Sequence, residues 1–463
     1  MQIHKFKLDE NIVLLDVNSG TVHLIDQTVY EVLDYYRGDN PEDVYKGLID
    51  KYSKVELDEI ICELDNLISQ GLLFSKEPEM PEVFKEQPIV KSLCLNIAHD
   101  CNLRCEYCFA STGDFGTNNR AMMSREVGEK AIEFAIKGSA NRHNLEIDFF
   151  GGEPLVNWQV NKHLINYVRK REKEVGKNIK LTLTTNATLL NDEIISFLND
   201  NRVMLVISLD GRKETHDKMR PFPKDVGSYD AAVAGFKKVV QMRSDKNYYV
   251  RGTYTRYNLD FAQDVLDMAK LGKEISVEPV VGVDEPYALL SEDLPKLFEE
   301  YDILARIYLQ RQLKGEGFNF FHFNVALDGG PCLNKRLAGC GAGHEYFAVT
   351  PEGDLYPCHQ FVGREEYKLG NLDTGVVKNE LVSSFRNAHI LNKPECMKCW
   401  ARYHCSGGCH ANADTINGDI YKPYELGCEL QRKRLECAIL LQAVLKHSQG
   451  EAKEKLKNFT YVE

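Results

Sequence analysis

Apolar and polar residues follow two periods along the middle of this chain, and each period predicts one kind of element. From about residue 90 to 315, apolar runs of strand length alternate with stretches in which apolar residues recur every three to four positions, as on one face of a helix. The expected strands cover residues 93–97, 145–150, 180–184, 203–208, 248–255 and 275–280. The expected helices cover residues 124–137, 157–174, 192–198, 229–242 and 261–271.

These repeated strand–helix units predict an α/β fold with a parallel sheet of about six strands. Six units are fewer than a closed eight-stranded barrel needs. We therefore expect an open sheet or a partial (β/α)6 barrel over residues 91–315, with a mouth wide enough for a large substrate.

The first 80 residues predict a small module of their own. Residues 11–16 and 21–25 alternate in hydrophobicity, and Asn18-Ser19-Gly20 between them is typical of a hairpin turn. Helical patterns follow over residues 28–36, 41–52 and 57–70. We expect a module over residues 1–80 and a linker over 81–90.

Beyond residue 315 the regular patterns fade and cysteines become frequent. Of the 14 cysteines, three fall within residues 101–108 and eight within 332–428. Cys62, Cys94 and Cys437 stand apart, as free thiols in a core would. We expect residues 316–430 to form a domain built around metal or iron–sulfur clusters, and residues 431–463 to form a helical tail.

Charge and composition narrow the function further. The formal net charge of −12 and the pI near 5.6 argue against a nucleic-acid-binding protein. No segment approaches the roughly 18 consecutive apolar residues of a membrane helix, and the first residues lack the apolar stretch of a secretory signal. We expect a cytoplasmic protein without a membrane partner, in which clustered cysteines hold metal.

The first cysteine group has the spacing Cys101-x3-Cys105-x2-Cys108. Three thiolates on one loop can hold three irons of a 4Fe–4S cubane and leave the fourth iron open to a small molecule. A structural zinc site is the alternative, with His99 as its fourth ligand.

With Tyr107 before its last cysteine and an expected strand before the loop, this group resembles the signature of the radical SAM superfamily. The resemblance implies that the fourth iron binds the amino and carboxylate groups of S-adenosylmethionine (SAM). Gly151-Gly152-Glu153-Pro154 resembles that family's motif for the methionine amino group. Further SAM contacts are expected at Tyr107, Asn186, Ser208 (ribose), Asp210 and Arg220 (carboxylate). A turn-capping Ser208 and a solvated Arg220 are the structural alternatives.

The later cysteines resemble the SPASM extension, which carries two auxiliary 4Fe–4S clusters. By that resemblance one cluster is bound by Cys396, Cys399, Cys405 and Cys428. The other is bound by Cys340, Cys358 and Cys409, with Cys332 as a candidate fourth ligand. If Cys332 does not bind, an open iron could take a substrate thiolate; zinc knuckles are the alternative to both clusters. The implied cofactors are SAM and three 4Fe–4S clusters.

The N-terminal module resembles the winged-helix-like peptide-recognition element of peptide-modifying enzymes, which binds a leader peptide as an added strand. A winged-helix DNA-binding module is the alternative, disfavoured by the acidic Glu56, Asp58, Glu59 and Glu63.

Over nearly its whole length the chain resembles the maturases of SCIFF peptides, the six-cysteine peptides of clostridia-like anaerobic bacteria. That resemblance implies thioether formation between a cysteine sulfur and a carbon in a ribosomally made, cysteine-rich precursor peptide. The implied partners are this peptide, bound through its leader, and a reductant such as flavodoxin or ferredoxin.

The mechanism implied by the resemblance begins with reductive cleavage of SAM to a 5′-deoxyadenosyl radical. This radical removes a hydrogen from the peptide, and the resulting carbon radical joins a cysteine sulfur while an auxiliary cluster accepts the surplus electron. The thiol must also lose a proton, and Asp210, Asp328 and His344 are weak candidates for that base. Alternatives are an anaerobic sulfatase maturase that makes formylglycine, another peptide crosslinker (carbon–carbon bond formers included), and a non-catalytic multi-cluster electron carrier.

Overall fold

The computed structural model describes residues 2–79, 89–243, 246–327 and 333–450. Its N-terminal module contains a three-stranded antiparallel sheet of β1 (Ile3–Leu8), β2 (Asn11–Asp16) and β3 (Val22–Ile25), in that spatial order. The sequence predicted only the β2–β3 hairpin. Strand β1 was not predicted, because its apolar residues do not alternate strictly and only Phe6 among them is buried.

Three helices follow the small sheet, as predicted: α1 (Gln27–Tyr35), α2 (Pro41–Leu48) and α3 (Lys54–Ser69). Each begins at a residue whose side chain accepts a backbone N–H of the first turn, namely Asp26, Asn40 and Ser53. The module has its own apolar core, to which α3 contributes Leu57, Ile60, Ile61 and Leu64. Cys62 lies on the other face of α3 and is exposed, so the expectation of a core thiol was wrong there, whereas Cys94 and Cys437 are buried.

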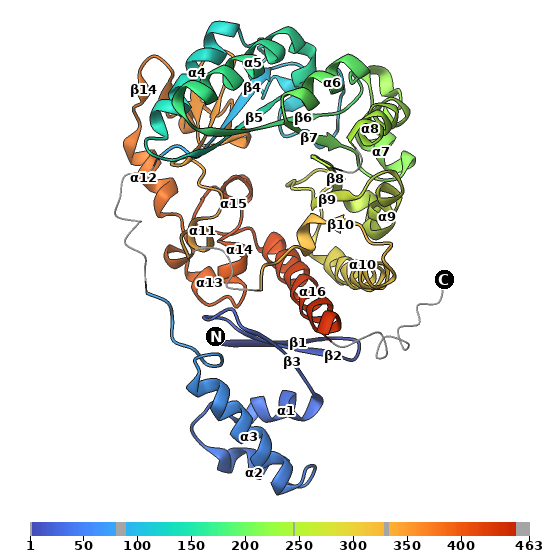
Figure 1. The fold of residues 1–463 in the computed structure, drawn as a ribbon, viewed down its shortest axis with the longest axis vertical. Coiled ribbons are helices and arrows are strands. Elements are labelled where there is room, and N and C mark those ends of the chain that lie inside the picture. Colours follow the sequence, from blue (N-terminus) through green and yellow to red (C-terminus); the bar gives the residue numbers. More distant parts are fainter. Residues whose placement is uncertain (1, 80–88, 244–245, 328–332, 451–463) are drawn as a thin grey trace.

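The central domain is built on six neighbouring parallel strands. They are β4 (Ser92–Ala98), β5 (Asn144–Gly151), β6 (Asn178–Thr185), β7 (Val203–Ser208), β8 (Tyr248–Tyr254) and β9 (Glu274–Pro279). The predicted helices are α4 (Arg125–Gly138), α5 (Trp158–Val175), α6 (Asp192–Asp200), α8 (Tyr229–Arg243) and α9 (Phe261–Leu271). Figure 1 shows these helices along the outer side of a curved sheet. Two helices that the sequence did not predict join them, α7 (Lys213–Met219) and α10 (Leu294–Lys314).

The sheet stays open, which confirms the predicted partial barrel in an α/β fold. Its full order is β10-β9-β8-β7-β6-β5-β4-β11-β12-β13-β14, so β10 (Asn319–Phe320) and β14 (Gly375–Val376) lie at opposite edges. Along β7, the buried Val203, Leu205 and Ile207 alternate with less buried residues that end in Ser208. The first set faces the helices, and the second faces the interior of the barrel.

The cysteine-rich part of the chain extends this sheet. Strand β11 (Tyr346–Val349) pairs in parallel with β4, and β12 (Asp354–Tyr356) and β13 (Gly370–Asn371) continue in antiparallel order. Short helices follow: α11 (Leu333–Ala338), α12 (Asn379–Asn387), α13 (Pro394–Met397), α14 (Arg402–Cys405) and α15 (His410–Asn417). One sheet therefore runs through both regions that the sequence divided at residue 316.

The long helix α16 (Glu425–Gly450) joins all three regions. It begins three residues before Cys428, packs against α10, and contacts the small sheet of the N-terminal module (Figure 1). At that contact the His4 ring stacks on Trp400 with ring centroids 3.9 Å apart, and His4 Nε2 lies 2.9 Å from Glu436 Oε1. Among the described residues, no helix is long and apolar enough to cross a membrane.

Candidate active site

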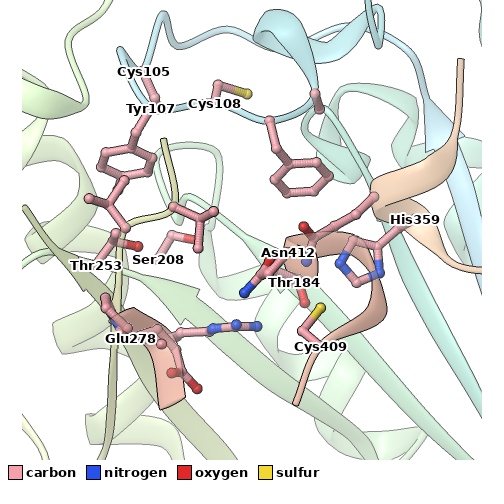
Figure 2. Close-up of a pocket in the computed structure, with 18 of the residues that line it drawn as sticks. Cys105, Tyr107, Cys108, Thr184, Ser208, Thr253, Glu278, His359, Cys409 and Asn412 are labelled. Atoms are coloured by element: carbon pink, nitrogen blue, oxygen red, sulfur yellow. The ribbon is translucent and has the colours of Figure 1, made fainter. Parts of the chain in front are cut away.

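The mouth of the partial barrel opens into a cavity of about 600 Å³. Its wall combines residues from the loop after β4, from the carboxyl ends of β5 to β9, from the region of Cys405 to Cys409, and from the first turns of α16. In Figure 2, Cys105 and Cys108 lie on one side of this space, and Cys409 and Asn412 lie on the other. The two predicted cysteine groups therefore share one cavity.

Cys101, Cys105 and Cys108 lie on the loop that follows β4, and all three are free thiols. The backbone N–H of Arg104 donates to the Pro221 carbonyl at 2.7 Å, which anchors the loop to the segment after α7. Burial raises the pKa of Cys101 to about 12 and that of Cys105 to about 11. Both thiols are therefore protonated at neutral pH unless a bound metal displaces the proton.

The Gly151-Gly152 pair at the end of β5 brings its backbone close to this loop. A Cβ on Gly151 would lie 2.4 Å from the Ala98 carbonyl oxygen, and one on Gly152 would lie 2.2 Å from that of Asp100. Gly151 also has a φ of +130°, which side chains rarely allow. Only glycine fits at either position, and both line the cavity.

Glu153 is buried directly after the two glycines and before Pro154. Its Oε1 accepts from Leu155 N at 3.0 Å and from Thr185 Oγ1 at 2.8 Å, while its Oε2 accepts from Asn186 N at 2.8 Å. Burial raises the pKa of Glu153 to about 7, and the three donors oppose that rise. The structure thus holds one carboxylate in a fixed orientation on the cavity wall.

Asn186 and Ser208 stand at the ends of β6 and β7, and both line the cavity. The amide of Asn186 donates to Asn102 Oδ1 at 2.8 Å, and its nitrogen lies 3.9 Å from Cys101 Sγ. This contact ties the end of β6 to the cysteine loop. Ser208 lies beside the cavity in Figure 2.

Tyr107, Asp210 and Arg220 form one buried cluster. The Tyr107 hydroxyl donates to Asp210 Oδ2 at 2.5 Å and accepts from Arg220 Nη1 at 2.7 Å. Asp210 Oδ1 also accepts from Thr253 N at 3.0 Å and lies 3.8 Å from Arg220 Nη1. Burial raises the pKa of Asp210, and the neighbouring guanidinium opposes that rise. Arg220 lines the cavity, and its buried Nε has no hydrogen-bond partner in the described structure, which leaves it free for an anion.

The three candidates for a base stand in different places. The carboxylate of Asp210 already contacts Tyr107, Thr253 and Arg220. This geometry suits a residue that holds Arg220 in place better than a base. His344 does not line the cavity; its Nδ1 lies 3.1 Å from the Ala342 carbonyl, and burial lowers its pKa. Asp328 lies outside the described residues, as does Cys332.

The later cysteines form two groups. Cys396, Cys399, Cys405 and Cys428 come from α13, the turn after it, α14 and the first turn of α16. Burial raises the pKa values of Cys396 and Cys428, and the charges of Cys405 and Cys399 add to that rise. Burial raises the pKa of Cys358, and the charges of Cys409 and Cys340 add to that rise. The two ligand sets that the sequence resemblance implied stay predictions. Among the described residues, no three His, Cys, Asp or Glu side chains could hold a single metal ion.

Sequence reasoning missed several residues of the cavity wall. His359 follows Cys358, packs on Phe150 with centroids 4.9 Å apart, and has Nδ1 2.9 Å from the Tyr346 hydroxyl. Burial lowers the pKa of His359 to about 4, so its ring is neutral. Opposite it, Arg434 of α16 donates to Glu278 Oε2 at 3.0 Å. The sequence could have identified Glu278 as a candidate site residue, because it is a polar residue at the end of a predicted strand. Nothing in the local sequence distinguishes Arg434 from other residues of its helix.

Comparison with known proteins agrees with this arrangement. Residues 95–250 match the profile of the Radical SAM superfamily, and residues 340–400 match SPASM, described as an iron–sulfur cluster-binding domain. The radical SAM cyclopropyl synthase TigE of Paramaledivibacter caminithermalis is 22% identical over 93% of each chain. The cysteine-type anaerobic sulfatase-maturating enzyme of Clostridium novyi is 25% identical over 70% of this chain and 90% of its own.

Solved structures share the fold. Native anSMEcpe with bound AdoMet and the Cp18Cys peptide has a TM-score of 0.60 at 22% identity, covering 77% of this chain and 99% of that one. Streptococcus suis SuiB bound to S-adenosylmethionine has a TM-score of 0.52 at 16% identity, covering 92% of this chain and 98% of that one. SuiB bound to its precursor peptide SuiA has a TM-score of 0.50 at 15% identity, covering 90% and 96%.

Proposed function

Because the chain carries a radical SAM domain followed by a SPASM domain, we propose that it cleaves SAM and uses the resulting radical to form thioether bonds in a peptide. The substrate would be a ribosomally made, cysteine-rich precursor. The observation that carries the proposal is the shared cavity, which is lined by Cys101, Cys105 and Cys108 and also by Cys405, Cys409 and Cys428. Figure 2 shows Cys105 and Cys409 on opposite sides of it. A peptide held there reaches both groups at once.

The residues of the first group fit a 4Fe–4S cluster with SAM on its open iron. Three thiols supply three ligands, the glycine pair lets backbone approach the ligand, and Glu153 offers a fixed acceptor for an ammonium group. Arg220, held by Tyr107 and Asp210, offers its unpartnered Nε to a carboxylate. When bound, cluster and SAM supply the electron and the 5′-deoxyadenosyl radical.

The N-terminal module supports a peptide substrate. Strand β3 lies at the edge of the small sheet, so its outer backbone groups can accept an added strand from a leader peptide. SuiB, which shares the fold over most of this chain, has been solved with its precursor peptide. We propose that the leader binds at this edge beside α3 and brings the modified part of the peptide to the cavity.

The chemistry of the thioether requires two oxidising equivalents. One hydrogen atom leaves the acceptor carbon for the SAM-derived radical, one proton leaves the cysteine thiol, and one electron passes to an auxiliary cluster as the carbon–sulfur bond forms. The proposal includes three 4Fe–4S clusters. It also includes a flavodoxin or ferredoxin, which reduces the first cluster and takes the electron back from the auxiliary cluster. The side chain that takes the thiol proton is not assigned.

The second candidate is formylglycine formation, because cysteine-type sulfatase maturases are among the similar proteins. A third is another peptide modification by the same cavity, since TigE spans 93% of this chain. Formylglycine differs from a thioether in product mass, because the cysteine CH2SH group becomes CHO. A thioether and a carbon–carbon bond each remove two hydrogens, so they differ only in which atoms tandem mass spectrometry finds joined.

The test uses anaerobically reconstituted full-length enzyme, SAM, dithionite and a short cysteine-rich peptide with its leader. We expect release of 5′-deoxyadenosine, and tandem mass spectrometry should locate a loss of two hydrogens between a cysteine and another residue. Cys105→Ala should abolish both, whereas Cys62→Ala, at an exposed thiol, should retain both. Release of 5′-deoxyadenosine by the Cys105 variant at the wild-type rate would sink the proposal.

A further inference from the structure

Lys393 is buried among the later cysteines without a carboxylate partner. It directly precedes α13, its side chain is fully buried, and its Nζ donates to the Gly407 carbonyl at 3.0 Å. Among the described residues, no Asp or Glu forms an ion pair with it. Burial lowers the pKa of Lys393, so the ammonium form needs a nearby anion to persist at neutral pH.

The groups around Lys393 identify that anion. The thiols whose negative charge would act on its Nζ are Cys396, Cys405, Cys409 and Cys428. Three of these belong to one proposed cluster and Cys409 belongs to the other. Two other titratable neighbours, His389 and His410, carry no negative charge in either protonation state. Gly407 lies in the turn between Cys405 of one group and Cys409 of the other, so its bond to Lys393 holds the ammonium group beside both groups of proposed ligands.

We propose that Lys393 is a positioning residue whose fixed positive charge, buried between the two auxiliary clusters, raises their reduction potentials. This inference rests on the proposed function. A thiolate-ligated cubane carries a net negative charge that grows by one when the cluster is reduced, so a nearby buried cation stabilises the reduced form more than the oxidised form. In the proposed reaction the peptide loses the electron and the adjacent cluster gains it, and the flavodoxin or ferredoxin then accepts it.

The Lys393 side chain also connects two segments, because its bond to Gly407 joins α13 to the Cys405–Cys409 turn. Two neutral variants distinguish the effect of this hydrogen bond from the effect of the positive charge. Lys393→Gln keeps a donor for the Gly407 carbonyl and removes the charge, whereas Lys393→Met removes both. Lys393→Arg keeps the charge, and Lys398→Met removes an exposed lysine of the same segment, where solvent screens the charge.

The experiment is a potentiometric titration of each reconstituted full-length variant, followed by the EPR signals of the reduced clusters, with iron counted per chain. We expect both neutral variants to keep wild-type iron and to shift the auxiliary midpoint potentials to more negative values. Lys393→Arg should remain near wild type, and Lys398→Met should not shift. The neutral variants should also release 5′-deoxyadenosine at the wild-type rate while forming less crosslinked peptide.

Two results overturn the inference. Unchanged auxiliary potentials in iron-loaded Lys393→Gln would show that the charge does not act on the clusters. Loss of auxiliary iron in both neutral variants would show that the side chain serves cluster assembly instead. Failure of the proposed function looks different, because wild-type enzyme would then lack auxiliary iron, would not cleave SAM, or would cleave SAM without forming a thioether.

Discussion

Replacing Glu153 by glutamine tests the proposed SAM site with a change of one heavy atom. The carboxylate accepts from two backbone N–H groups, Leu155 through Oε1 and Asn186 through Oε2. A glutamine amide has only one oxygen, so one of these N–H groups faces an NH2 whichever way the amide turns. A buried donor left without an acceptor costs about 1–3 kcal/mol. The substitution also removes the negative charge that we propose for the SAM ammonium group.

The expected loss of SAM affinity follows from that charge. A hydrogen bond to a charged group contributes about 1.5–3 kcal/mol, which corresponds to roughly a tenfold to hundredfold weaker Kd. The measurement is equilibrium binding of SAM to cluster-loaded enzyme without reductant. Glu193→Gln is the matched control, because this side chain is 77% exposed and its pair with Lys162 should contribute little.

The pH dependence of stability provides a second measurement on the metal-free protein. The pKa of Glu153 rises from 4.5 to about 7 on folding, so the folded state binds the proton more tightly than the unfolded state. Stability from this group is fully present below pH 4.5, falls as pH rises, and is lost above pH 7, a change of about 3 kcal/mol. Glu153→Gln should remove this fall from the denaturation midpoints. A variant with wild-type SAM affinity and a wild-type pH profile would refute the assignment of Glu153.

Further substitutions test other parts of the site. Tyr107→Phe leaves Asp210 and Arg220 each short of one buried hydrogen bond; equilibrium binding should show SAM affinity reduced roughly tenfold or more, while Tyr45→Phe, at an exposed hydroxyl, should match wild type. Cys405→Ala should lower the iron content from about twelve to about eight per chain, and an unchanged count would contradict its role as a ligand. Gly152→Ala would place a Cβ 2.2 Å from the Asp100 carbonyl oxygen, which should cost about 1–3 kcal/mol and diminish the EPR signal of the first cluster. Leu24→Asp on β3 should weaken leader binding in a fluorescence anisotropy assay, whereas Ile49→Asp, exposed after α2, should not.

Local patterns made much of the architecture predictable. The six central strands and five of the helices between them were expected within a few residues of their observed ends, because burial of one face imposes a period on the local sequence. Strand β1 and helices α7 and α10 were not predicted. Strand β1 buries only Phe6, and helix α7 is one short segment, KETHDKM, with buried residues at His216 and Met219.

The sequence by itself located the first cysteine group and narrowed its chemistry to an iron–sulfur cluster or a zinc site. Cys101, Cys105 and Cys108 lie on one loop, so their spacing alone limits what they can bind, and Glu153 follows a glycine pair at a strand end. Tertiary structure decided what surrounds them. The Tyr107–Asp210–Arg220 cluster joins residues up to 113 positions apart. The pairing of β11 with β4 and the approach of α16 place the second cysteine group across the same cavity. The role proposed for Lys393 also depends on tertiary structure. Its side chain is buried because distant segments pack around it, and the local sequence does not show which segments these are.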